Sequence, residues 1–139
     1  MTRAIIQKIT IGFGAIYALV GVLGFIPGIT QFSDRYGAVP LEGTLLGIFA
    51  VNLIHNVAHL MLGGALIVGG RSTGAVITTN RIMTAVFIVL TIASFIAPLV
   101  EGVNLNPPDT ILHLASALLT GYLGFLADRQ ATSAASPAR

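Results

Sequence analysis

Long uncharged stretches, separated by short polar segments, dominate this chain. Charged residues are absent between Lys8 and Asp34, Glu42 and Arg71, Arg81 and Glu101, and Asp109 and Asp128. A helix needs roughly 20 apolar residues to cross the hydrocarbon core of a bilayer. Backbone groups in lipid must also be hydrogen-bonded within the structure. The pattern therefore predicts an all-α fold, a bundle of four transmembrane helices.

We expect one transmembrane domain over residues 1–128, with spans at about 9–27, 44–70, 82–100 and 108–127. Gly43-Thr44 is expected to open the second span, the longest of the four. In "NPPD", residues 106–109, Asn106 can cap the fourth helix and Asp109 complements its dipole. The small, polar residues 129–139 are expected to form a disordered cytoplasmic tail.

Composition supports the membrane assignment. Hydrophobic residues make up 55% of the chain and charged residues 9%, against about 25% charged residues in soluble domains. Cytoplasmic loops of membrane proteins carry an excess of Lys and Arg. Only Arg35 would lie on the outer side, and the other six basic residues on the inner side: Arg3, Lys8, Arg71, Arg81, Arg129 and Arg139. Both termini are therefore expected in the cytoplasm, and the protein in the cytoplasmic membrane.

A weak internal repeat relates the two halves of the chain. "HLMLGGALIVGG" in the second span resembles "HLASALLTGYLG" in the fourth. Both predicted helix hairpins begin on the same side, so the halves would form a parallel repeat about an axis along the membrane normal. Chance similarity between apolar helices explains the same likeness.

Polar side chains interrupt the second span in "VNLIHNVAHL", residues 51–60. At about 100° per residue, Asn52, His55, Asn56 and His59 fall within roughly 100° of one helix face, and Met61 lies opposite. Polar groups inside a bilayer are costly and usually face the bundle interior. These four residues, which we call the polar stripe, are therefore expected to face other helices.

The fourth span has a similar face with less polarity. His113, Ser116, Ala117, Thr120 and Gly124 share one side of the predicted helix. Counted from the charges at the inner helix ends, His55 and His113 reach about the same depth. Provided that the second and fourth helices are neighbours, three imidazoles would occupy one band of the bundle.

Several functions fit these residues. The polar stripe can fix helix pairing by hydrogen bonds, in a structural or accessory protein. Alternatively, His55, His59 and His113 can ligate haem or a transition metal between the second and fourth helices. Ligating imidazoles are oriented by hydrogen-bonding neighbours, for which Asn52, Asn56, Ser116 and Thr120 are available. A proton or solute conduit is less favoured, because four helices leave little room for a pore.

Other function classes find little support. The sequence has no phosphate-binding loop, no paired carboxylates and no Ser/His/Asp set, so an enzyme is not indicated. The basic residues are scattered, which does not indicate a nucleic-acid partner. The expected partner is the lipid bilayer, and a homo-oligomer or a larger membrane complex is left open. The absence of cysteine excludes disulfides and thiolate metal sites.

Two runs resemble an uncharacterised family of small bacterial membrane proteins, grouped as a domain of unknown function. The first is "FAVNLIHNVAHL", with Phe49, Val51, Asn52, His55, Asn56, His59 and Leu60 at the matching positions. The second is "DTILHL", with Asp109, Leu112, His113 and Leu114. The resemblance extends over nearly the whole chain. It implies a four-span protein of the bacterial cytoplasmic membrane, and it implies no activity.

Overall fold

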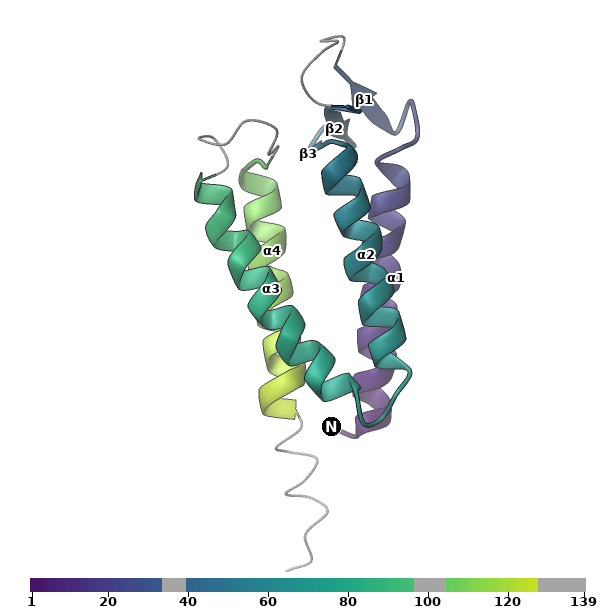
Figure 1. Ribbon diagram of the computed structural model, residues 1–139, viewed down its shortest axis with the longest axis vertical. Coiled ribbons are helices and arrows are strands. Elements are labelled where there is room, and N and C mark those ends of the chain that lie inside the picture. Colours follow the sequence, from purple (N-terminus) through teal and green to yellow (C-terminus); the bar gives the residue numbers. More distant parts are fainter. Residues whose placement is uncertain (34–39, 97–104, 128–139) are drawn as a thin grey trace, which may run out of the picture.

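Four long helices form two hairpins in the computed structural model, which describes residues 1–33, 40–96 and 105–127. The helices are α1 (Arg3–Leu23), α2 (Leu53–Gly70), α3 (Val76–Ile96) and α4 (Pro107–Gly121), and a π-helical turn, η2 (Tyr122–Leu126), continues α4. Figure 1 shows α1 beside α2 and α3 beside α4, with both hairpins beginning at the end that carries the N-terminus. All four, with α4 counted through η2, are long and apolar enough to cross a membrane, which confirms the predicted bundle. The expected tail at 129–139 and the expected end of the third span at 97–100 lie outside the described residues.

The first and third helices begin earlier than predicted. α1 starts at Arg3 rather than near residue 9, and α3 starts at Val76 rather than near residue 82. Lys8 and Arg81 therefore lie inside helices. Long cationic side chains can extend from a helix end towards water or polar groups, so they do not mark where the helix stops. Arg81 Nε, for example, donates to the backbone oxygen of Gly124 at 2.8 Å.

The predicted start of the second span is wrong. Residues from Gly43 onwards form two strands of a small antiparallel sheet, with order β1 (Thr30–Phe32), β2 (Gly43–Leu45) and β3 (Phe49–Val51). Leu46 and Gly47 adopt φ values of 54° and 71° in the turn that joins β2 to β3. Positive φ at both central residues is typical of the tight turns of β-hairpins. Hydropathy alone does not distinguish a short apolar strand from a helix. Because these strand residues carry no charge, they were assigned to the second span.

The sheet lies beyond the end of α1 and before the start of α2, opposite the N-terminus (Figure 1). We call this end of the bundle, with the first turns of α2 and α4, the sheet end. The opposite end, where α1 begins and η2 finishes, is the N-terminal end. At the sheet end, Thr30 Oγ1 donates to the backbone oxygen of Leu23 at 3.0 Å and links β1 to α1.

Glycines bring α1 and α2 into close contact. A Cβ atom added to Gly14 would lie 2.8 Å from the backbone oxygen of Gly63, and one added to Gly63 would lie 2.5 Å from the backbone nitrogen of Ala18. Real side chains do not tolerate such distances, so both positions require glycine. Small residues at helix contacts are typical of membrane bundles, where association depends on close packing. Gly14 of α1 and Gly63 of α2 thus allow the two helices to approach closely.

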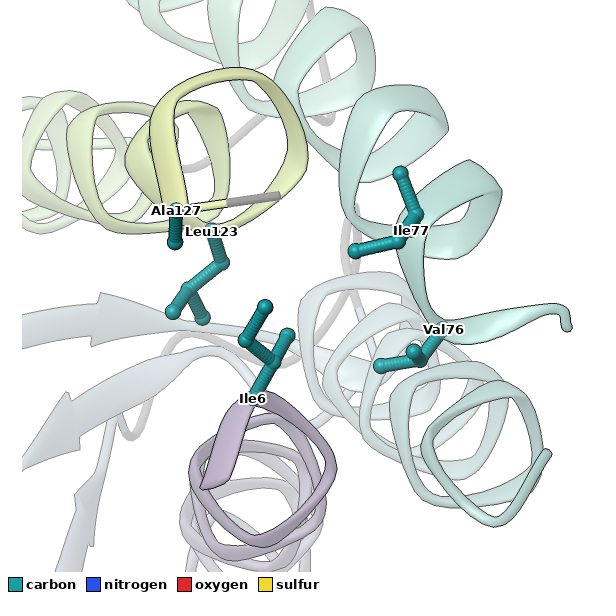
Figure 2. Packing of buried hydrophobic residues seen from close by; sticks show 5 residues of the cluster. All are labelled: Ile6, Val76, Ile77, Leu123 and Ala127. Carbon is teal, nitrogen blue, oxygen red and sulfur yellow. The ribbon is translucent and has the colours of Figure 1, made fainter. Parts of the chain in front are cut away.

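Two apolar clusters join the hairpins. The first, at the N-terminal end, consists of Ile6, Val76, Ile77, Leu123 and Ala127. Figure 2 shows Ile6 of α1 and Leu123 of η2 directed towards each other, with Val76 and Ile77 of α3 beside them. The second cluster lies halfway along the bundle and consists of Tyr17, Leu66, Met83, Phe87 and Ala117. The N-terminal end is therefore closed by apolar side chains from three helical segments.

Candidate functional site

The polar stripe of α2 faces the interior of the bundle. Asn56 and His59 are buried and His55 is nearly so, whereas Met61 on the opposite face is 70% exposed. This is the arrangement that the helical periodicity predicted. A lipid-facing exterior and a polar line directed inwards place these side chains where only other helices, water or a ligand can reach them.

Asn52 does not belong to the helical face, although it was predicted there. It precedes α2 as its N-cap, with an extended backbone, and its side chain accepts a hydrogen bond from the backbone N–H of His55 at 2.8 Å. This bond satisfies one of the free N–H groups at the start of a helix. Asn52 therefore fixes where α2 begins and hence where His55 lies.

Three rings stack along the interior side of α2. The ring centroids of His55 and His59 lie 4.8 Å apart at an interplanar angle of 13°. Tyr17 of α1 also stacks on His59, with ring centroids 4.8 Å apart at an interplanar angle of 9°. Tyr17 was not predicted as a site residue, and the structure places it in the site. Tyr17 lies far from α2 in the sequence, so no motif or spacing predicted this stacking.

Tyr17 also links the two hairpins. Its hydroxyl oxygen lies 2.6 Å from Ser116 Oγ of α4. Ser116 has one hydroxyl proton, which it donates to the backbone oxygen of Leu112 at 2.7 Å, so Tyr17 is the donor in the pair. Ser116 and Thr120 were predicted to orient ligating imidazoles. In the structure, Ser116 binds Tyr17, and Thr120 donates to the backbone oxygen of Ser116 at 2.8 Å.

His113 of α4 approaches the stripe from the second hairpin. It is 3% exposed, like His59. The main backbone contacts of α4 are with α3, and those of α2 are with α1. His113 is nevertheless close enough to His55 and His59 for electrostatic interaction. Phe87 of α3 fills the space beside it, with ring centroids 6.5 Å from His113 and 5.2 Å from Tyr17.

Asp109 brings a buried carboxylate to the sheet end of the site. It forms a capping box with Asn106, whose backbone N–H donates to Asp109 Oδ2 at 2.9 Å, as the "NPPD" run predicted. Asp109 also hydrogen-bonds to the backbone of Ala50 in β3. His55 Nε2 lies 4.0 Å from Asp109 Oδ1, so α2 and α4 meet here. The signal that could have found Asp109 is its spacing of four residues from His113, which places both on one helix face.

Several polar atoms of this site have no hydrogen-bond partner. Among the described residues, these buried atoms are Asn56 Nδ2, His59 Nδ1, His59 Nε2 and His113 Nδ1, together with Asn80 Oδ1 nearer the N-terminal end. The His59 ring lies beside the backbone of Tyr17, yet neither of its nitrogens is in hydrogen-bonding geometry. Native proteins leave few buried polar groups unpaired. Four of the five atoms lie on the stripe and on His113.

The predicted three-histidine metal site is not assembled within the part of the chain that the structure describes. There, no group of three or more His, Asp or Glu side chains is arranged so that it could hold a metal ion. Ligation of haem needs no more than two imidazoles and is not tested by this observation, so it stays a prediction. The structure brings imidazoles of opposite hairpins within electrostatic range of each other.

Comparison with known proteins identifies the family. A family model described as "Domain of unknown function (DUF4383)" matches residues 7–126. The chain belongs to this family. The match covers both runs on which the resemblance was based, and it confirms an uncharacterised domain family. No curated protein and no solved structure matches this DUF4383 chain.

Proposed function

We propose that this DUF4383 protein is an accessory membrane protein that holds a small ligand between its two helix hairpins. The ligand site consists of His59 and Asn56 on α2 and His113 on α4. Both termini of the protein lie in the cytoplasm in this proposal, as the distribution of Lys and Arg predicts. In this proposal the polar stripe serves a binding function and is more than a device for helix pairing.

The unpartnered polar atoms carry this proposal. Leaving a buried donor or acceptor unpaired costs roughly 1–3 kcal/mol, and four such atoms lie together here. Elsewhere in the bundle, polar side chains form hydrogen bonds across the hairpins, as in the bond from Asn80 Nδ2 to Thr10 Oγ1 at 2.8 Å, although Asn80 Oδ1 is unpartnered as well. A ligand that bonds to the imidazoles would remove the cost at the site.

The test is to identify what co-purifies with the full-length protein in mild detergent. We expect one small molecule at near-stoichiometric amount in organic extracts of the wild type. The amount should fall in His59→Leu and His113→Leu and stay unchanged in Met61→Leu, a matched control on the lipid-facing side of α2. Extracts of the wild type and His59→Leu with identical composition would refute the proposed site.

An absorption spectrum and metal analysis of the same preparation test the haem and transition-metal alternatives. Haem bound through His59 and His113 would give a Soret band, and a metal ion would be present in near-stoichiometric amount. His113→Ala should remove either signal. A colourless, metal-free protein that haemin, zinc and copper leave unchanged in thermal stability would exclude both.

A purely structural role is the second candidate, and the bond between Tyr17 and Ser116 favours it. That bond, at 2.6 Å, joins α1 to α4 without any ligand. If the stripe only provides hydrogen bonds between helices, a polar replacement should suffice. His59→Asn would then keep the stability of the wild type, and His59→Leu would lose it. The ligand proposal expects both variants to lose binding.

The orientation in the membrane is tested by cysteine labelling, because the chain has no cysteine. Ser72→Cys reports on the turn between α2 and α3 at the N-terminal end, and Ile48→Cys reports on the sheet end. With an impermeant reagent on intact cells, Ile48→Cys should be labelled and Ser72→Cys protected. Labelling of Ser72→Cys alone would show that the orientation is the opposite of the proposed one.

A further inference from the structure

The unpartnered atoms call for a ligand that accepts hydrogen bonds. Asn56 Nδ2 is a donor, and a neutral imidazole has one donor nitrogen, so His59 and His113 can each offer an N–H. The neighbouring hydroxyls are already used. Tyr17 donates to Ser116, and Ser116 donates to a backbone oxygen. Asp109 accepts from the capping box and from β3. The donors of the site therefore lack acceptors, and the second nitrogen of His59, which is also unpartnered, can itself accept a hydrogen bond.

The surroundings of these donors favour a neutral ligand. Within the described part of the chain, the Lys and Arg side chains belong to the first two turns of α1 and α3 and to the end of α2, all at the N-terminal end: Arg3, Lys8, Arg71 and Arg81. An anion at His59 would thus lack a cationic partner there and would lie near the carboxylate of Asp109. Charging the imidazoles inside a membrane is costly, so they offer neutral donors.

Aromatic side chains border the donors and favour a small, flat ring. Tyr17 stacks on His59, and Phe87 lies against both Tyr17 and His113. Flat rings pack well against such faces and edges. A tetrapyrrole, which is much larger, would have to displace Phe87 or Tyr17 from the middle apolar cluster, of which both are members.

The ligand must also partition into lipid. The outer faces of the helices are apolar, with Ile54, Met61 and Ile111 each at least 68% exposed. The N-terminal end is closed by the cluster around Ile6 and Leu123 (Figure 2). A molecule that reaches His59 and His113 from the bilayer therefore needs apolar character, together with acceptors on its ring.

We infer that the ligand is a membrane quinone, bound by its ring between the two hairpins, with one carbonyl oxygen accepting from His59 and the other from His113. A quinone is neutral and flat, has two carbonyl acceptors on opposite edges of its ring, and carries an apolar tail suited to lipid. The inference rests on the proposed function of this site and specifies the ligand class. It concerns binding and involves no transfer of electrons.

Binding is tested with a short-chain ubiquinone and a short-chain menaquinone, added to the full-length protein in detergent. We expect a saturable rise in the melting temperature with at least one of them. His59→Leu and His113→Leu should each weaken the affinity about tenfold, as loss of one hydrogen bond to the ligand implies. Met61→Leu should bind as the wild type does. The infrared carbonyl band of the bound quinone should lie at lower frequency than in detergent alone, because its oxygens accept hydrogen bonds.

The other outcomes separate the two proposals. If a different small molecule co-purifies through His59 and neither quinone binds, the quinone inference is wrong and the binding function stands. If haemin alone stabilises the wild type, the site takes a tetrapyrrole and the inference is equally overturned. If nothing co-purifies and no probe binds, both fail. Equal binding of quinone by the wild type and His59→Leu would show partition into detergent or lipid and would also overturn the inference.

Discussion

The two ends of the bundle differ in the side chains that form the buried interface between the hairpins. At the N-terminal end, Ile6 and its neighbours close the interface with apolar side chains, and the amide nitrogen of Asn80 donates to Thr10 Oγ1 and to the backbone oxygen of Val76, each at 2.8 Å. Towards the sheet end, His59 and His113 occupy an equally buried interface with unpaired ring nitrogens. The first region stabilises the fold by apolar packing and hydrogen bonds. The second leaves buried nitrogens unpaired, which lowers the stability of the fold. Such a contrast within one small domain is expected where a site must be free to bind.

The largest effect should come from opening the apolar end. Ile6 is fully buried in the N-terminal cluster, so Ile6→Ala leaves a cavity between the hairpins. We expect a loss of about 2 kcal/mol, the low end for such changes, because lipid is as apolar as the side chain removed. The measurement is the free energy of unfolding in detergent, with Ile5→Ala as control at a neighbouring position that is 46% exposed. An equal loss in both variants would mean that the cluster is not a packed interface.

The next comparison uses one residue type at the two ends. Asn80 and Asn56 are both buried, but only the Asn80 amide nitrogen has partners. Alanine removes the same atoms from each, so the cavities are similar and the difference reflects hydrogen bonds. Asn80→Ala should lose about 1 kcal/mol more stability than Asn56→Ala, as expected for two bonds inside a membrane protein. The reverse order would contradict the assigned bonding of the two amides.

A smaller effect is expected for the bond that joins the hairpins between these ends. Tyr17→Phe removes the hydroxyl that donates to Ser116 and keeps the ring that stacks on His59. The loss should be about 0.6 kcal/mol, the average for such bonds in membrane proteins. A double-mutant cycle with Ser116→Ala isolates the pair, and Tyr122→Phe, on the partly exposed η2, serves as control. Absence of coupling in the cycle would show that the hydroxyls do not interact.

The sequence predicted the features that depend on local periodicity. The inward direction of His55, Asn56 and His59 follows from helical spacing, and the cap at Asn106 follows from "NPPD". Prediction from the sequence failed where hydropathy does not distinguish a strand from a helix. Uncharged residues 43–52 form a sheet and an N-cap instead of a helix. Lys8 and Arg81 lie within helices, so charge did not mark the helix starts there.

The site itself was only half predictable. Its histidines stand out because polar residues are rare in an apolar span. Tyr17 and Phe87 come from other helices, and their approach to His59 and His113 depends on how the hairpins pack. Whether a buried nitrogen finds a partner is decided by tertiary geometry, which no spacing in the sequence records. The unpaired state of His59 is therefore a finding of the structure alone.

The central claim is that the His59 imidazole has no partner in the ligand-free protein. The most direct measurement compares the free energy of unfolding of the wild type and His59→Leu after exhaustive exchange into detergent. An unpaired buried imidazole contributes no hydrogen bond, so replacing it by an apolar side chain of similar size should leave stability unchanged or raise it. A loss of about 1 kcal/mol or more in His59→Leu would contradict the account, because it would mean that the imidazole is already hydrogen-bonded within the bundle.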